Sequence, residues 1–241
     1  PGGDIGRLAV NGTVNDLAVM GARPLYISCA LVLEEGLDFA DLERILDSMK
    51  AEADRAGVAI VTGDTKVVPN GKADKIFINT SGIGIMERKI QRGEIVPGDR
   101  VIVSGTIGDH GMAIMALRNN LSFSKGLQSD CAHLNHMIAK ITDNYPDSVK
   151  FMRDPTRGGV ASVLNEIVKG KSYSAMLSEE ALPIRDEVKG VCGILGIEAL
   201  YAANEGKVVI IAGEADADGI VKLMRATPEG RDAAVIGEIT T

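Results

Sequence analysis

Two neighbouring side chains near the start of this chain of 241 residues, an amide and a carboxylate, are of types that could bind a ligand. Asn15 and Asp16 lie at the start of an apolar, helix-like segment over residues 14–22. At a helix start both side chains commonly accept hydrogen bonds from backbone amides, and this capping role explains them without any ligand. The Asp16 carboxylate also offers hard oxygen ligands to a divalent cation. The two interpretations are compatible, and the sequence leaves both open.

A second segment suits phosphate recognition. Gly63, Asp64, Thr65 and Lys66 follow a predicted buried strand over residues 58–62. Glycine lets a backbone approach a phosphate closely, threonine supplies a hydroxyl and lysine supplies a point charge. The spacing differs from that of the P-loop, and a surface turn with a solvated lysine is the simpler alternative.

Two glycine-containing loops share one pattern, since each opens a predicted helix, and the first of them also follows a predicted strand. Residues 104–111 and residues 153–159 both place backbone amides at a predicted helix start, which suits a bound anion. Ordinary capping explains both loops equally well. The sequence assigns no role to Asp109, His110 or Arg157 within them.

Cys131, His133 and His136 raise the question of a zinc or nickel site, because two histidines three residues apart share a helix face. No fourth ligand is evident in the sequence, and packing or solvent-facing positions on a helix are the alternative. The three cysteines of the chain are scattered and form no CxxC pair, so we expect reduced thiols.

The composition excludes two classes of partner. Lys and Arg total 26 against 33 Asp and Glu, which gives a net charge of −7, and aromatic residues make up 3%. A nucleic-acid binder needs a basic face and stacking aromatic side chains, so we expect no nucleic acid as partner. The apolar stretches are too short to span a bilayer and no signal peptide opens the chain, so we expect a cytoplasmic protein without a membrane partner.

The elements that must position these residues alternate between helix and strand, which indicates a mixed α/β fold. In the first half we expect a helix over 14–22 that ends before Pro24, and a helix over 39–56 that is capped by Asp38 and closed by Gly57. We expect strands in this half over 26–33, 58–62 and 76–86. In the second half we expect strands over 101–104, 207–212 and 234–239 and helices over 111–118, 132–142, from 159 onward and 216–226. A boundary at 93–99 predicts two lobes, residues 1–92 and residues 93–241.

Taken in order, five segments resemble one family: NDLAVMGARP from Asn15, GDTK from Gly63, GTIGDHG from Gly105, RDPTRGG from Arg153 and ANEGK from Ala203. They resemble the ATP-binding, PurM-like superfamily of aminoimidazole ribonucleotide synthetase and selenophosphate synthetase. Within it they resemble the HypE family of carbamoyl dehydratases, which serve hydrogenase maturation. The resemblance covers nearly the whole chain. It implies a two-lobe fold with a C-terminal α/β lobe and an N-terminal lobe that contributes to a dimeric β-barrel-like interface.

The resemblance also implies an activity and its site residues. ATP would phosphorylate a carbamoyl group on the sulfur of the protein's own C-terminal Cys, and loss of phosphate would leave a thiocyanate that supplies cyanide to the iron of nickel–iron hydrogenase. The implied nucleotide-binding residues are Asn15, Asp16, Gly63, Asp64, Thr65 and Lys66, and the implied Mg²⁺ ligands are Asp16 and Asp154. Lys66 would face the reacting phosphate or carbamoyl group, and Glu205 would be the base toward the carbamoyl nitrogen.

The implied partners are a second copy of the chain, a HypF-like carbamoyltransferase and a HypC–HypD-like cyanide acceptor complex. The family's N-terminal portion and its tail with a terminal Cys are absent from the sequence, so we expect a fragment that is inactive alone. Two alternatives are a synthetase of the same superfamily that acts on a small amide or on selenide, and a scaffold lobe that docks maturation partners without turning over ATP.

Overall fold

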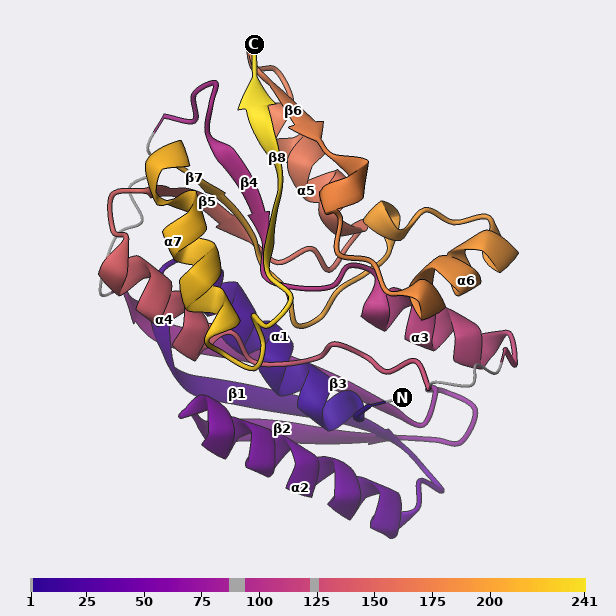
Figure 1. Cartoon of the computed structure of the whole chain (residues 1–241). Helices are drawn as coiled ribbons and strands as arrows, with labels where there is room; N and C mark the ends of the chain where they lie inside the picture. The colour runs from indigo at the N-terminus through magenta and orange to yellow at the C-terminus, as the bar shows by residue number, and fades with distance from the viewer. Residues whose placement is uncertain (1, 87–93, 122–125) are drawn as a thin grey trace.

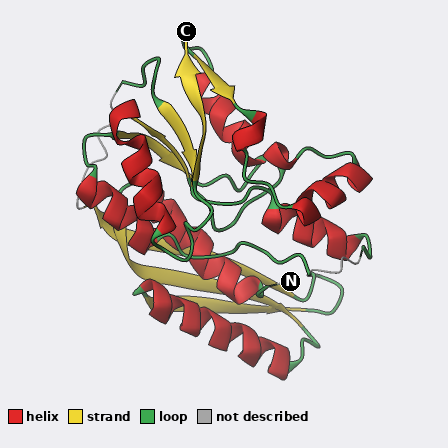
Figure 2. Cartoon of the chain, in the orientation of Figure 1, coloured by secondary structure: helices red, strands yellow, loops and turns green. Residues whose placement is uncertain are grey.

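The computed structural model describes residues 2–86, 94–121 and 126–241, which form two lobes, each built on its own β-sheet (Figure 1). Helices pack against both sheets, and long loops cross the region where the lobes meet (Figure 2). The architecture confirms the predicted mixed α/β class with two lobes. The predicted boundary between residues 92 and 93 falls outside the described residues.

The N-terminal lobe is a three-stranded sheet with helices on one face. The strand order is β2-β1-β3, and β1 (Ala22–Glu34) pairs parallel with β2 (Ala59–Val68) and antiparallel with β3 (Ile76–Met86). Helices α1 (Ile5–Val19) and α2 (Phe39–Ala56) pack together against the side chains on one face of β1. The exposed apolar side chains of the sheet include Tyr26, Phe77, Ile83 and Ile85. They alternate along the strands with the residues that face the helices, so they lie on the uncovered face.

The C-terminal lobe is a five-stranded antiparallel sheet in the order β5-β7-β4-β8-β6. Its strands are β4 (Arg100–Val103), β5 (Val149–Arg153), β6 (Ser174–Leu177), β7 (Val209–Ala212) and β8 (Ala234–Thr240). Helices α4 (Asn135–Asn144) and α7 (Glu214–Arg225) bury one face, and α5 (Gly159–Val168) buries the other. Helices α3 (Asp109–Arg118) and α6 (Asp186–Leu195) form a separate small core, and two short 3₁₀ turns lie at Glu179–Ala181 and Ala199–Tyr201.

Helix α1 belongs to both lobes. Val10 and Val14 are buried in the core of the N-terminal lobe, whereas Ala18 and Val19, one to two turns later, are buried in the core of the C-terminal lobe. The helix therefore crosses the junction, and the residues between these two pairs lie where the lobes meet.

Two sequence expectations about the first lobe are wrong. Helix α1 begins at Ile5 rather than at residue 14, because the Asp4 carboxylate caps it by accepting the amides of Gly6 and Arg7 at 3.0 Å. The interspersed glycine and asparagine residues hide this first part from an apolar pattern. The strand predicted as buried over 58–62 extends to Val68, and the side chains of residues 59–67 are exposed. The strand β2 lies at the edge of the sheet, with a neighbouring strand on one side only.

The strands β5 and β6 and the helix α6 were absent from the sequence expectations. Within the described part of the chain no helix is both long enough and apolar enough to cross a membrane.

Candidate active site

A cleft of about 680 Å³ is lined by α1, by β5 with the loop that follows it, by α5 and by the turn before β7. Four of its lining residues are acidic: Asp16, Asp154, Glu166 and Glu205. Two are basic, Arg153 and Arg157. The structure therefore brings together three of the predicted site residues, Asp16, Asp154 and Glu205, from segments far apart in the sequence.

Asp16 lies at the junction of the lobes on α1, and its environment is electrostatically mixed. Partial burial raises the pKa of its carboxyl group above the ordinary value, and the charge of Asp154 raises it further. The guanidinium groups of Arg153 and Arg157 act in the opposite direction. Two carboxylates that repel each other, flanked by two cations, suit a ligand that brings both a divalent cation and phosphate oxygens.

Glu205 has the most strongly shifted carboxyl group of the cleft. Burial raises its pKa to about 7, with further contributions from the charges of Asp130, Asp154 and Asp16. A carboxylate with a pKa near neutrality exchanges a proton readily at physiological pH. Glu205 is therefore suited to act as a general base.

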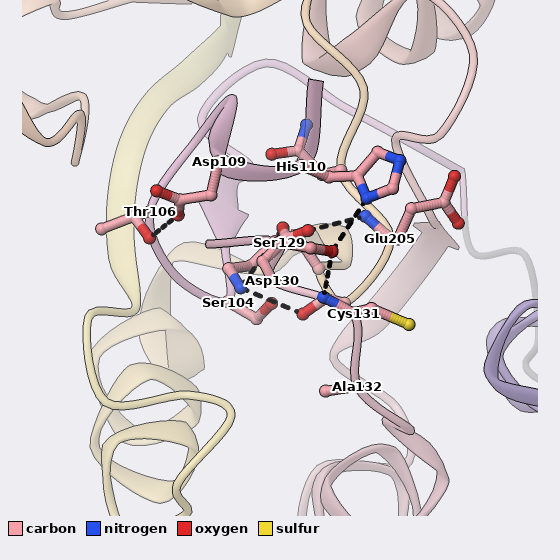
Figure 3. Close-up of polar contacts among 12 residues, drawn as sticks. Ser104, Thr106, Asp109, His110, Ser129, Asp130, Cys131, Ala132 and Glu205 are labelled. Atoms are coloured by element: carbon pink, nitrogen blue, oxygen red, sulfur yellow. Dashed lines mark hydrogen bonds and ion pairs between the residues drawn. The ribbon is translucent and has the colours of Figure 1, made fainter. Parts of the chain in front are cut away.

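The backbone of Glu205 is held on both sides. Its N–H group donates to Oδ1 of Asp130 at 3.0 Å, and its carbonyl accepts from Nδ2 of Asn15 at 3.2 Å. Figure 3 shows the Asp130 contact, with the Glu205 carboxylate directed away from the Asp130 side chain. Sequence reasoning missed Asp130, because nothing in its local sequence marks it as a partner of residue 205.

Asn15 is buried, and its predicted capping role is wrong because it lies in the interior of α1. Its amide donates to the carbonyl groups of Ala132 at 2.9 Å and Glu205 at 3.2 Å, and its Oδ1 accepts the N–H of Leu134 at 2.8 Å. These contacts occupy the polar atoms of the side chain. The structure thus shows a link between segments, and the predicted contact of Asn15 with a nucleotide stays a prediction.

The four residues Gly63, Asp64, Thr65 and Lys66 are exposed and lie within β2, not in a loop after it. None of them lines the cleft that holds Asp16 and Glu205. The Asp64 carboxylate accepts the N–H of Thr65 at 2.9 Å. Their predicted roles toward the nucleotide stay predictions.

Oxygen atoms of the protein already accept the backbone amides that an anion would need in the loop over residues 104–111. The amides of Ile107, Gly108 and Gly111 donate to the Pro183 carbonyl, to Oδ1 of Asn204 and to the Ala203 carbonyl, at 2.9, 2.7 and 2.9 Å. These three amides are therefore not available to an anion, and the expectation is wrong for them. The loop instead anchors the turn that carries Glu205.

Asp109 and His110 of this loop do not line the cleft, and their side chains contact Thr106 and Ser129 (Figure 3). Burial raises the pKa of Asp109, whose carboxylate accepts a hydrogen bond from the Thr106 hydroxyl. Burial lowers the pKa of His110, whose Nδ1 lies 2.8 Å from the Ser129 hydroxyl. Both residues fasten the start of α3 to its surroundings.

The histidines considered for zinc or nickel have other partners. Nδ1 of His133 lies 2.9 Å from Oε1 of Glu52, and Nε2 of His136 lies 3.0 Å from the Arg55 carbonyl. Burial raises the pKa of Cys131 to about 11, and its sulfur accepts from Nδ2 of Asn11 at 3.4 Å. Across the residues that the structure describes, no three His, Cys, Asp or Glu side chains are arranged to hold a metal ion by themselves.

Known proteins match the sequence and the fold of this chain over nearly all of its residues. Residues 1–86 match the N-terminal domain, and residues 96–241 the C-terminal domain, of AIR synthase related proteins. Carbamoyl dehydratase HypE of Rhodobacter capsulatus is 50% identical over 239 residues, which cover 98% of this chain and 70% of that protein.

Two crystal structures show the same fold. A HypE–HypF complex matches with a TM-score of 0.94 and 48% identity, covering 100% of this chain and 79% of that chain. A hydrogenase maturation protein HypE in complex with ATP matches with a TM-score of 0.94 and 46% identity, covering 100% of this chain and 72% of that chain. On its sequence and its fold together, the chain belongs to the HypE family of carbamoyl dehydratases, within the AIR synthase related proteins.

Proposed function

We propose that the chain carries the site at which ATP drives the dehydration of an S-carbamoyl group to a thiocyanate. One observation supports this more than any other: Asp16, Asp154 and Glu205 meet in one cleft, where the pKa of Glu205 is about 7. ATP as the co-substrate is supported by the HypE relative whose crystal structure contains it.

The reaction that we propose has two steps. The carbamoyl oxygen attacks the γ-phosphorus of ATP while the carbamoyl nitrogen loses one proton, which gives ADP and an imidate phosphate. The nitrogen then loses its second proton, the carbon–oxygen bond breaks, and phosphate leaves with the former carbamoyl oxygen. A carbon–nitrogen triple bond remains on sulfur. One of the two protons lost from nitrogen stays on the phosphate as HPO₄²⁻ and the other is released, so ATP and the carbamoyl group yield ADP, phosphate, one free proton and a thiocyanate.

We assign Glu205 as the base that removes the proton from the carbamoyl nitrogen, because its carboxylate is partly desolvated and its pKa is near neutrality. Arg153 and Arg157 line the same cleft and can offset the charge of phosphate oxygens. Arg153 also pairs with Glu166 at 3.1 Å, which fixes its position at the rim.

Asp16 and Asp154 fit a magnesium ion that arrives with the nucleotide. Mg²⁺ takes oxygen ligands and is usually bound by one or two carboxylates together with substrate phosphates. The mutual repulsion of these two carboxylates is relieved by such a cation, and in the described residues no third ligand completes a protein-only site. When bound, the ion would neutralise charge on the transferred phosphoryl group.

The carbamoyl group that we propose as substrate is carried on the sulfur of a C-terminal Cys of the protein. A HypF-like carbamoyltransferase is the proposed donor, which the crystallised complex of a HypE relative with HypF supports. A HypC–HypD-like complex is the proposed acceptor of the cyanide. We place this exchange in the cytoplasm, in keeping with the three free cysteines.

A homodimer formed through the N-terminal sheet is part of the proposal. The uncovered face carries exposed Tyr26, Phe77 and Ile83, and such a patch is typical of an interface. In the β1–β2 register Asp64 lies beside Ala30, and Lys66 lies beside Val32. Ala30 and Val32 point to the uncovered face, because side chains alternate along β1 and Cys29 points to the covered face. Asp64 and Lys66 therefore lie on the face that a second copy would meet, and a nucleotide role for Gly63, Asp64, Thr65 and Lys66 depends on that assembly.

The base is tested by Glu205→Gln. We supply ATP, Mg²⁺ and a synthetic peptide ending in S-carbamoylcysteine to the protein at the full length of its HypE relatives, and we follow the loss of one water from the peptide by mass spectrometry. The rate should fall about 10²–10⁴-fold, as is usual when a positioned base is lost, while the affinity for ATP stays unchanged. Glu43→Gln, at an exposed carboxylate of α2 outside the cleft, is the control and should retain activity. An unchanged rate in Glu205→Gln would remove this residue from the mechanism.

The metal site is tested by Asp16→Asn. Removal of one of two carboxylates weakens Mg²⁺ binding, so ATP turnover should fall at least about tenfold and should recover partly at high Mg²⁺ concentration. Turnover at the wild-type level in low Mg²⁺ would exclude Asp16 as a ligand. Chelation of Mg²⁺ with EDTA should stop turnover of the wild-type chain completely.

A further inference from the structure

The turn that carries Glu205 has a support that the catalytic proposal does not explain. Each backbone polar group of Glu205 is bound by a side chain from a different segment, Asp130 on the N–H and Asn15 on the carbonyl. Side chains that bind the two peptide groups on either side of one residue fix its position more tightly than a single contact does. We propose that Asp130 and Asn15 are positioning residues, which set the Glu205 carboxylate relative to Asp16. The inference rests on the proposed role of Glu205 as base.

Asp130 is a costly residue to bury. Its side chain is 3% exposed, and its Oδ2 atom has no hydrogen-bond partner. The nearest cation is the Lys207 ammonium, whose Nζ lies 3.4 Å from Oδ2 and donates at 3.2 Å to the Gly206 carbonyl. A buried carboxylate with one oxygen that lacks a hydrogen bond costs the fold stability, so its presence at this position indicates a further role. The hydrogen bond that Oδ1 accepts from the Glu205 amide is evidence for that role.

The Glu205 turn is built closely against the Asp130 backbone. A Cβ atom at Gly206 would lie 1.9 Å from the Asp130 carbonyl oxygen and 2.7 Å from the Ala132 nitrogen, so no larger residue fits. The two chain segments therefore touch along their backbones as well as through the Asp130 side chain. A rigid contact of this kind transmits the position of one segment to the other.

Asn15 connects this pair of segments to α1. One side chain binds Ala132, Leu134 and Glu205, and the next residue in the helix is Asp16. Helix α1 thereby holds the segment that carries Asp130, the turn that carries Glu205 and the proposed Mg²⁺ ligand in one fixed arrangement. The distance between the proposed base and the proposed metal ligand follows from these contacts.

The role is tested by a double-mutant cycle between residues 130 and 205, with the dehydration of the S-carbamoylcysteine peptide as the assay. Asp130→Ala should lower kcat about 10²-fold, the cost of displacing a base by about 1 Å, and leave the KM for ATP unchanged. In the Glu205→Gln background the same change should alter kcat by less than about twofold, because a residue that acts through Glu205 has nothing left to position. Asp130→Asn keeps an oxygen acceptor for the Glu205 amide and should restore kcat to within about tenfold of the wild type.

Two further variants complete the experiment. Asn15→Asp keeps the acceptor for Leu134 and loses the donors to Ala132 and Glu205, so it should show the same loss and the same dependence on Glu205. It takes the place of Asp130→Ala if that variant does not fold. Asp147→Ala, at an exposed carboxylate, is the control and should leave kcat unchanged.

The outcomes separate the two proposals. A wild-type kcat in Asp130→Ala or Asn15→Asp, together with a large loss in Glu205→Gln, overturns the positioning role and leaves the base in place. Equal losses with and without the Glu205 carboxylate also overturn it, since they show a general structural effect. A wild-type kcat in Glu205→Gln overturns the role of Glu205 and this inference with it.

Discussion

Glu52 is a buried carboxylate of α2 that contacts two arginine residues of its own lobe and His133 of the other lobe. Its side chain is 2% exposed and lies 3.0 Å from Nη1 of Arg55, 2.9 Å from Nδ1 of His133 and 3.6 Å from Nε of Arg7. Burial by itself raises the pKa of this group, but the hydrogen bonds from His133 and Asn11 and the charge of Arg7 outweigh it, and the pKa lies below the ordinary value of 4.5. The ionised form is therefore the one that the fold stabilises.

We expect Glu52→Gln to destabilise the protein in a pH-dependent way. A carboxyl group with a lowered pKa stabilises the fold above its unfolded-state pKa, and this contribution is lost as the pH falls below about 4.5. Urea unfolding should show a loss of about 1–3 kcal/mol at pH 7 and a difference from the wild type that shrinks as the pH falls below 4.5. Glu43→Gln, exposed on the same helix, is the control and should show no such dependence. A constant difference at all pH values would contradict the ionised state of Glu52.

At the scale of elements, helix α2 shows what a sequence can predict. The Asp38 carboxylate accepts the Ala40 amide at 2.8 Å, and Gly57 ends the helix in the left-handed conformation at φ 71°. Both ends were predicted, because capping depends on residues within one turn of the helix. The exposure of β2 was not predicted, because it depends on which faces other elements cover.

The same distinction applies to the candidate site. The grouping of Asp16, Asp154 and Glu205 was predicted only through family resemblance, since their spacing along the chain says nothing about their proximity. Asp130 was missed altogether, because its partner Glu205 lies 75 residues away and neither residue carries a local signal of the contact. Residues that support a site through long-range contacts become visible only in the folded structure.

The cap of α2 gives a prediction at this scale. Asp38→Ala removes the acceptor for the Ala40 amide in the first turn of the helix and should cost about 1 kcal/mol, or about 2–4 °C in Tm for a chain of this size. Asp47→Ala, exposed in the middle of the same helix, replaces aspartate by a better helix former and should raise Tm slightly. Circular dichroism melts of both variants measure the difference. Equal shifts in the two variants would contradict the capping role.

At the scale of the whole molecule, the uncovered face of the N-terminal sheet predicts a dimer. Ile83 of β3 is 70% exposed on that face, and a charge there should prevent a second copy from packing against it. Sedimentation velocity should give twice the 25.4 kDa of the chain for the wild type and 25.4 kDa for Ile83→Asp. Ile194→Asp changes an equally apolar side chain, 61% exposed on α6, and should leave the dimer intact. A wild-type chain that sediments as a monomer would contradict the proposed interface.

The contact between Asn15 and Glu205 joins residues that are 190 positions apart, and this separation sets when the site can exist during synthesis. At about 5–20 residues per second, a ribosome needs about 10–40 s to pass from one partner to the other. During that time helix α1 has left the ribosome without the turn that completes the cleft. A chain whose synthesis has not reached residue 205 therefore lacks the contact that brings the proposed base to the helix of the proposed metal ligand.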